Sequence, residues 1–278
     1  MKLTTLLKQC FTLLVLGISW PLFASSMTQS QLPMSQFNFQ GFVPDSREAR
    51  RQAEEDPNLI RLLVDPSFYW VINRIIDRYQ ETRPSPFRIH QGTHLDLERL
   101  LDEGLQFDIL IFTEMARAHE QVTRNRATEA RVLAIGRMGL WAPLESARSL
   151  NVLRLQNEAI GLAAENSVHY RAAREVLERQ EMLREVENRL KATGEFEDLF
   201  ERVKTREIPI AFLPWQRLVE GGIDRQRDVL KLPADHHSRI VYAAALTNAG
   251  NQRANARSFW DFLFNDRSAT ELRRAGFD

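Results

Sequence analysis

Short apolar runs alternate with longer amphipathic ones from residue 59 onward, and this order constrains the fold more than any other feature of the sequence. Residues 59–64 (LIRLLV) precede the helical pattern FYWVINRIIDRYQ, and residues 87–90 precede a second helical pattern that ends at Gly104. Apolar runs of this length between helices are typical of buried strands in a parallel sheet, with each helix crossing back over it. We therefore expect an α/β fold built from βαβ units.

The same reading extends along the chain. Asp65 is a candidate cap for the first helix, and Pro66 suits its first turn. Further strands are expected at residues 107–112, 137–142, 159–164, 208–213, 229–232 and 239–246, and helices at 46–55, 170–190, 196–205, 254–265 and 269–274. Three Arg/Glu-rich stretches, RATEAR, RAAREVLERQEMLREVENRL and RSATELRR, fit solvated helix faces with alternating charges.

Residues 1–24 have the pattern of a secretory signal peptide. A basic start precedes an apolar run at residues 10–23, and small residues follow, which predicts cleavage after Ala24 or Ser26. The alternative is an N-terminal membrane anchor, but spanning a bilayer takes about 20 apolar residues. We expect export to the periplasm with the peptide removed, followed by an arm and short helix at residues 25–57.

The charge balance and the single cysteine exclude several classes of protein. The 278 residues carry 37 Lys+Arg and 37 Asp+Glu, and removal of Lys2 and Lys8 with the signal peptide leaves 35 cations against 37 anions. A dedicated nucleic-acid binder would carry a basic excess, so no nucleic-acid partner is expected. Cys10 is also removed, so the mature chain has no disulfide, thiol nucleophile or cysteine metal site.

Five segments, in collinear order, resemble one known family. They are LLVDPSFYWVI, FRIHQGTHLDLERLLDEGLQFDILIF, AIGLAAENSVHYRAAREVL, VKTREIPIAFL and SFWDFLFNDRSATELRRAGFD. Together, over residues 58–278, they resemble the periplasmic substrate-binding proteins of ABC transporters, in particular the molybdate-binding branch.

The resemblance implies an α/β fold of two Rossmann-like lobes with a ligand cleft between them and a two-strand hinge, the type II periplasmic-binding architecture. The first lobe would comprise residues 58–138 and 239–278, the second residues 139–238, with crossings near 135–142 and 239–244. The implied function is capture of a small anionic solute, a molybdate-like oxyanion or a related ion, for an ABC permease at the inner membrane. We expect no enzymatic activity, no cofactor and a monomeric protein.

The resemblance also implies the ligand site. Ser67 stands at the family's first serine, and the second serine maps to His94, with Thr93 one position away. A second-lobe loop that is small in the family is Val168-His169-Tyr170 here, and a tyrosine of the family maps to Pro214. Further candidates are Arg171, at a helix start, and a backbone contact at Phe196. The expected ligand-binding residues are Ser67, Thr93, His94, His169, Tyr170 and Arg171.

Individual residues of the sequence also suggest other functions. His90, His94 and His169 could border the cleft and bind zinc, copper or nickel, but scattered polar histidines are the simpler interpretation. Ser67 lacks the glycines of a nucleophile elbow, and nucleotide-binding signatures are absent from the sequence. The rival from another class is a binding-protein fold recruited as a non-transport periplasmic interaction or sensory module with an eroded pocket.

Overall fold

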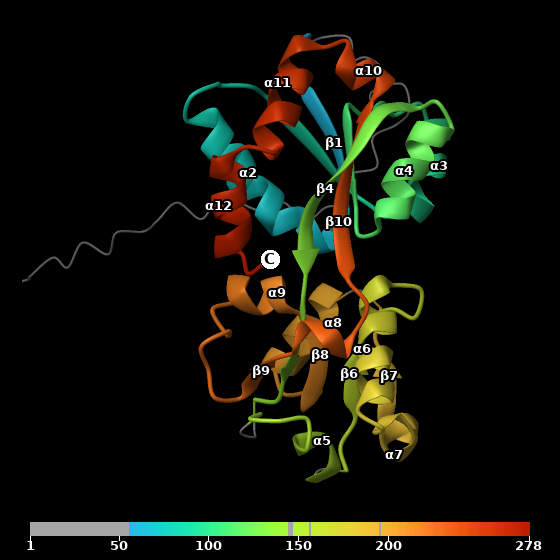
Figure 1. Cartoon of the computed structure of the whole chain (residues 1–278), viewed down its shortest axis with the longest axis vertical. Coiled ribbons are helices and arrows are strands. Elements are labelled where there is room, and N and C mark those ends of the chain that lie inside the picture. Colours follow the sequence, from blue (N-terminus) through green and yellow to red (C-terminus); the bar gives the residue numbers. More distant parts are fainter. Residues whose placement is uncertain (1–55, 144–146, 156, 195) are drawn as a thin grey trace, which may run out of the picture. The chain divides into compact units, whose positions relative to one another are not determined.

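Two five-stranded mixed sheets organise the chain (Figure 1). The computed structural model describes residues 56–143, 147–155, 157–194 and 196–278, all within one compact unit that spans Pro44–Asp278. The signal peptide, the arm and the helix expected at 46–55 lie outside the described residues. The α/β class expected from the alternating pattern is confirmed.

The first lobe is built on the sheet that opens the described chain. In spatial order its strands are β2 (Phe87–Gln91), β1 (Ile60–Val64), β3 (Ile109–Phe112), β10 (Ile240–Thr247) and β4 (Ala127–Gly136). The strands β2, β1 and β3 are parallel, whereas β10 runs antiparallel to both of its neighbours. The side chains of β1 and β3 are buried throughout, as expected of strands covered on both faces.

Helices cover both faces of this sheet. The apolar sides of α2 (Tyr69–Gln80), α11 (Ala254–Leu263) and α12 (Asp266–Arg274) pack in one core cluster. A second cluster lies under α3 (His94–Asp102) and α4 (Met115–Thr123). A short helix, α10 (Asn248–Asn251), follows β10. Asp65 caps the 3₁₀ helix η1 (Pro66–Phe68) through Ser67 N–H, and Gly104 follows α3 with φ of 86°, so both predicted helix signals are confirmed.

The second lobe repeats this arrangement on its own sheet. Its strands, in spatial order, are β7 (Leu190–Ala192), β6 (Ile160–Leu162), β8 (Ile210–Pro214), β5 (Met138–Trp141) and β9 (Val229–Lys231). Helix α6 (Val168–Arg179) packs on one face, and α8 (Phe196–Lys204) with α9 (Trp215–Glu220) packs on the other. The remaining elements are α5 (Val152–Leu155), α7 (Leu183–Val186), η2 (Glu187–Arg189) and η3 (Ala234–His236). None of the helices in the described part of the chain is long and apolar enough to cross a membrane.

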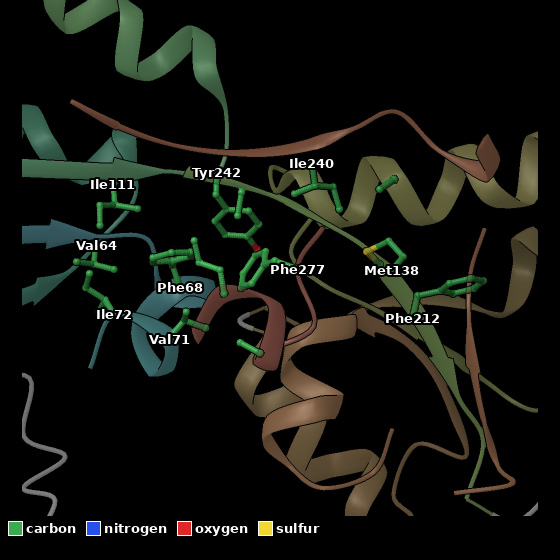
Figure 2. Packing of buried hydrophobic residues seen from close by; sticks show 14 of the residues in the cluster. Val64, Phe68, Val71, Ile72, Ile111, Met138, Phe212, Ile240, Tyr242 and Phe277 are labelled. Carbon is green, nitrogen blue, oxygen red and sulfur yellow. The ribbon is translucent and has the colours of Figure 1, made fainter. Parts of the chain in front are cut away.

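Two passages join the lobes, from β4 into β5 across Arg137 and from η3 into β10. The core is continuous through this junction, because residues of both sheets belong to one buried cluster. Phe68, Tyr242 and Phe277 meet there with ring centroids 5.0 to 5.5 Å apart, and Figure 2 shows the three rings close together. Asp278 continues the contact by exchanging backbone hydrogen bonds with Ile135 on β4.

Two expectations from the Arg/Glu-rich stretches are wrong. RATEAR does not lie on a helix; residues 127–131 of this stretch form the first half of β4, which occupies the edge of the first sheet, where charged residues protect an open strand from pairing. The helix expected at 170–190 ends at Arg179, because Glu181 adopts φ of 56° and Met182 N–H donates to Leu177 O. This is the bonding of a Schellman cap, formed here without the glycine that would reveal it in the sequence.

One buried ion pair fixes the first lobe internally. Asp108 is fully buried and accepts hydrogen bonds from Arg61 on β1, at 2.8 to 3.2 Å, and from Arg253 before α11, at 2.8 and 3.1 Å. Gly250 lies so close that a Cβ there would approach Asp108 O to 2.3 Å. Asp108 therefore holds together a strand of the sheet and the start of a covering helix.

Replacing Asp108 with alanine is expected to lower the free energy of unfolding by about 3–5 kcal/mol, because the Arg61 guanidinium would stay buried without its carboxylate. Urea denaturation of the protein measures this loss. Glu103→Ala, which removes an exposed ion pair with Arg99, is the matched control and should cost about 0–1 kcal/mol. Equal losses for the two variants would contradict the assignment.

Candidate functional site

A pocket of about 280 Å³ lies between the two lobes at the carboxyl ends of their parallel strands. The first lobe contributes residues that follow β1, β2 and β3, namely Asp65, Pro66, Thr93, His94, Leu95, Asp96, Thr113 and Glu114. The second contributes residues that follow β6 and β7, namely Ala163, Ala164, Asn166, Ser167, Val168, His169, Gly194 and Phe196. Ligands of open α/β sheets bind at this edge, outside the carboxyl ends of the strands.

Helix N-termini from both lobes reach the pocket, but they differ in whether acidic side chains lie in the first turn of the helix. The first turn of α3 carries Asp96, which accepts hydrogen bonds from Thr93 in a capping box. The first turn of α8 carries Glu197 and Asp198. Because these carboxylates offset the positive ends of their helix dipoles, neither end attracts an anion strongly.

The N-terminus of α6 is different, because its first turn contains no acidic residue. Ser167 caps this helix by accepting the Tyr170 N–H at 3.1 Å, and Arg171 N–H bonds to Ser167 O. The N–H groups of Val168 and His169 precede the first intrahelical bonds, and both residues line the pocket. The α6 N-terminus is therefore the pocket's best site for an anionic group.

Three of the six predicted ligand residues line this pocket. They are Thr93 and His94, at the start of α3, and His169, at the start of α6. Phe196, predicted as a backbone contact, also lines the pocket, whereas Pro214 ends β8 and is absent from the lining.

Ser67 lies behind the pocket wall, in a buried hydrogen-bond network. Its hydroxyl donates to Asp65 Oδ1 at 2.6 Å, and because the carboxylate only accepts, the Tyr242 hydroxyl must donate to Ser67 Oγ at 2.9 Å. The Tyr242 oxygen then accepts from Gln216 Nε2 at 2.5 Å and from His169 Nε2 at 3.1 Å. Ser67 thus positions Tyr242, and His169 is assigned as the neutral Nε2–H tautomer.

This network joins the lobes, since Asp65, Ser67 and Tyr242 belong to the first lobe and His169 and Gln216 to the second. All five residues are buried, and Tyr242 is fully so. Burial, followed by the Asp65 carboxylate, raises the pKa of the Tyr242 hydroxyl. Burial lowers the pKa of His169 to about 4, so both groups are neutral at physiological pH.

The other two predicted residues, Tyr170 and Arg171, are absent from the pocket lining. Tyr170 is half-buried and packs against the core of the second lobe. Arg171 is exposed, and its guanidinium binds Glu114 Oε1 of the first lobe at 2.5 Å. It lines an adjoining hollow of about 310 Å³ with Arg239 and Glu175. The contact of Arg171 with the site is therefore indirect, through Glu114.

The pocket lining is acidic. Its described residues include the carboxylates of Asp65, Asp96 and Glu114 and contain no lysine or arginine. Partial burial, followed by the Arg117 guanidinium, lowers the pKa of His94, so this imidazole adds no charge near neutral pH. Across residues 56–143, 147–155, 157–194 and 196–278, no group of three or more metal-ligating side chains is placed to hold an ion.

Sequence reasoning missed Tyr242, Gln216 and Glu114 as parts of the site. One feature of the sequence could have identified Tyr242. It lies within the apolar strand IVYAAAL, and a buried tyrosine needs a hydrogen-bond partner for its hydroxyl. No feature of the sequence identifies Gln216 or Glu114, since their contacts depend on how the two lobes pack against each other. Asp65 was predicted as a cap, and its place in the lining follows from the adjacent ends of β1 and β3.

Tyr242→Phe is expected to lower the free energy of unfolding by about 2–3 kcal/mol, because it leaves the buried partners of the hydroxyl unsatisfied. Urea denaturation measures the loss. The matched control is Tyr79→Phe, which removes a buried hydroxyl that makes one hydrogen bond, to Ser258 at 3.2 Å. A cost for Tyr242→Phe no larger than for Tyr79→Phe would contradict the network.

The lowered pKa of His169 predicts a pH dependence of stability. Below pH 6.5 His169 is protonated in the unfolded chain, whereas in the folded chain it stays neutral down to about pH 4. The contribution of His169 to the free energy of unfolding therefore falls by up to about 3 kcal/mol as the pH drops through this window. His169→Gln should flatten the stability profile between pH 6.5 and 4. The same substitution at the exposed His119 is the control, and identical profiles for the two variants would refute the assignment.

Comparison with known proteins agrees with this geometry. No curated protein matches the chain at a significant level. Among solved structures, the periplasmic molybdate-binding protein of Azotobacter vinelandii is similar with a TM-score of 0.71 and 14% identity, over 79% of this chain and 98% of that one. Peb3 from Campylobacter jejuni matches with a TM-score of 0.62 and 10% identity, over 78% and 98% of the two chains.

Iron-bound HitA from Pseudomonas aeruginosa is also similar, with a TM-score of 0.57 and 12% identity, over 79% of this chain and 85% of that one. At these identities the likeness concerns the fold, and it confirms the two-lobed periplasmic-binding architecture. The family model described as "Bacterial extracellular solute-binding protein" matches residues 60–278, so the chain belongs to the bacterial extracellular solute-binding protein family.

Proposed function

We propose that the protein is exported to the periplasm, captures a small solute between its lobes and presents the closed form to an ABC permease. The observation that carries this proposal is the interlobe pocket of about 280 Å³ with helix N-termini from both lobes in its lining. The predicted signal peptide and the family of extracellular solute-binding proteins support the location. The volume is at the small end of ligand pockets, about 300–1,000 Å³, which favours a small solute.

Contacts across the cleft support a fold that closes around its ligand. Besides the Tyr242 network, Arg171 pairs with Glu114. Elsewhere between the lobes, Arg74 on α2 pairs with Glu220 on α9 at 3.3 Å, and Trp70 Nε1 donates to Glu197 on α8 at 3.3 Å. Such exposed contacts are individually weak. They can therefore break and reform as the lobes move about the two connecting passages, as in hinge closure around a ligand.

The charge of the lining favours a solute with a single anionic group over a doubly charged oxyanion. At about 5 Å and an effective dielectric constant of about 20, two unit charges interact by about 3 kcal/mol, and a helix N-terminus acts as about half a positive charge. The α6 N-terminus can thus attract one negative charge. A second charge would meet the carboxylates of Asp65 and Asp96 with no lysine or arginine among the described lining residues. The charge of Glu114, the third carboxylate, is offset by Arg171 and Arg117 from outside the lining.

The fold alone does not determine which solute the protein binds. One structural neighbour is named as binding molybdate and another holds iron, so the lining residues of this chain must be read directly. Molybdate stays a less favoured ligand here, because Ser67, the serine that the resemblance assigned to the ligand, donates its hydroxyl to Asp65.

The second candidate is a sensory or interaction module without a transport role. The engagement of Ser67 in the interlobe network favours it, and a structural neighbour is the regulatory domain of HypT from Salmonella typhimurium, with a TM-score of 0.56 and 17% identity. An eroded pocket would bind no solute, whereas the transport proposal requires binding. Ligand binding therefore separates the two candidates.

A thermal-shift screen of the mature chain tests the proposal with inorganic oxyanions, small organic anions and amino acids. A true ligand at a hundred times its Kd adds about 2.7 kcal/mol to stability, which raises the Tm of a domain of this size by about 5–10 °C. Isothermal calorimetry of each positive compound, with molybdate, tungstate, sulfate and phosphate beside it, then gives the Kd.

Ala164→Tyr, which fills the pocket, should abolish the shift. Ala254→Tyr, at an exposed position at the start of α11, is the matched control and should keep it. The transport proposal fails if no compound stabilises the protein, or if the Ala164 variant responds like wild type.

A further inference from the structure

The four residues that follow α12, residues 275–278, lie between the two lobes. Figure 1 shows this stretch leading from α12 of the first lobe toward α9 of the second. Ala275 and Phe277 are buried, whereas Asp278 is exposed. We call residues 275–278 the interlobe segment, because its contacts reach both lobes.

Phe277 and Asp278 fix the interlobe segment to the first lobe. The centroid of the Phe277 ring lies 5.5 Å from that of Phe68 and 5.0 Å from that of Tyr242, and Figure 2 shows the three rings together. Asp278 N–H donates to Ile135 O at 3.1 Å, and Ile135 N–H donates to Asp278 O at 3.4 Å. Such a reciprocal pair of bonds joins opposed residues of antiparallel strands. The segment is thus anchored to β4 and to the aromatic rings of the junction.

Gly276 brings the interlobe segment against the second lobe. Its φ of 91° is a conformation that glycine adopts without the penalty that a Cβ imposes. A Cβ at this position would lie 2.8 Å from Val219 Cγ2 and 2.9 Å from Trp215 Cδ1, both on α9. Non-bonded carbon atoms prefer a separation of about 3.5–4.0 Å. The segment therefore packs on α9 with no space for a side chain at Gly276.

The side chain of Asp278 adds ionic contacts at the same place. It binds the guanidinium of Arg137, in the passage from β4 to β5, and its Oδ1 lies 4.0 Å from Lys231 Nζ on β9. The Trp215 N–H donates in turn to Arg137 O at 2.8 Å. Because exposed ion pairs stabilise a protein by at most about 1 kcal/mol each, the closely packed Gly276 and Phe277 are the residues to vary.

We propose that residues 275–278 act as a strap that sets the angle between the two lobes. The two connecting passages on their own permit rotation about a hinge. The interlobe segment is a third, non-covalent connection, because it is anchored to β4 of the first lobe and packs on α9 of the second. Rotation that separates α9 from the segment breaks this contact, and rotation in the opposite sense meets the backbone of Gly276. This inference goes beyond the proposed function, since it concerns the lobes in the absence of a solute.

Double electron–electron resonance between spin labels on the two lobes tests the strap. Asp261→Cys on α11 and Glu201→Cys on α8 place labels at exposed positions, and Cys10→Ser removes the natural cysteine of the chain. The distance between the labels is measured without any added solute. In the otherwise unchanged protein we expect a single narrow distribution of distances.

Gly276→Leu should shift the mean distance by about 2 Å or more, the size of helix shifts at packed interfaces. The reason is that the added side chain must displace either α9 or the interlobe segment. Gly222→Leu is the matched control, because Gly222 also has a positive φ, of 68°, but a Cβ there would meet nothing within 4 Å. Its distribution should equal that of the unchanged protein.

Phe277→Leu is a milder variant that decides the question if Gly276→Leu does not fold. It should widen the distribution of distances, because the smaller side chain loosens the anchor at the junction. Phe262→Leu, on α11, makes the same change at a position of similar burial, with 4% exposed against 5% for Phe277. This control should lose similar stability in urea denaturation and keep the narrow distribution.

An unchanged distribution in Phe277→Leu, or in a folded Gly276→Leu, would overturn the strap. An equal change in the matched control would also overturn it, since the change would then reflect a general loss of packing. Each of these results leaves solute capture standing, because no solute takes part in the measurement. Conversely, a thermal-shift screen without any stabilising compound would overturn solute capture and leave the strap standing.

Discussion

The hydroxyl of Tyr242 is the point at which the two lobes depend on each other. It is fully buried at the junction, donates to Ser67 of the first lobe and accepts from His169 and Gln216 of the second. Burying a hydroxyl without hydrogen-bond partners costs free energy. Each lobe therefore supplies hydrogen-bond partners for buried groups of the other. His169 also lines the pocket, which places the network directly beside it.

The pocket combines a shared fold with lining side chains that are particular to this chain. The position of the site follows from the topology, because both lobes place the carboxyl ends of parallel strands at the cleft. Its chemistry follows from a few substituted side chains. Ser67 bonds within the junction, His94 and His169 contribute imidazoles to the lining, and Asp65 and Glu114 line the same pocket as the N-terminus of α6.

The sequence predicted the elements better than the site, for a physical reason. Strands and helices follow from local patterns, such as the apolar run that became β1 or the Asp65 cap. Two helix predictions were wrong. One helix ended early because Glu181 adopts a positive φ without being a glycine, and a charged stretch expected on a helix instead forms part of the edge strand β4. Ser67 bonds locally to Asp65, but its bond to Tyr242 spans 175 residues and the Arg171–Glu114 ion pair spans 57. No local pattern could reveal these two long-range contacts.

One buried network couples the lobes and borders the pocket. Nitrogen-15 NMR of the histidine side chains tests it most directly, with His169→Gln used for assignment. We expect a neutral His169 with its proton on Nε2 at pH 7, and resonances that shift when a solute identified by thermal shift fills the pocket. An imidazolium or an Nδ1–H tautomer at pH 7, or resonances that stay unchanged at saturating solute, would contradict it.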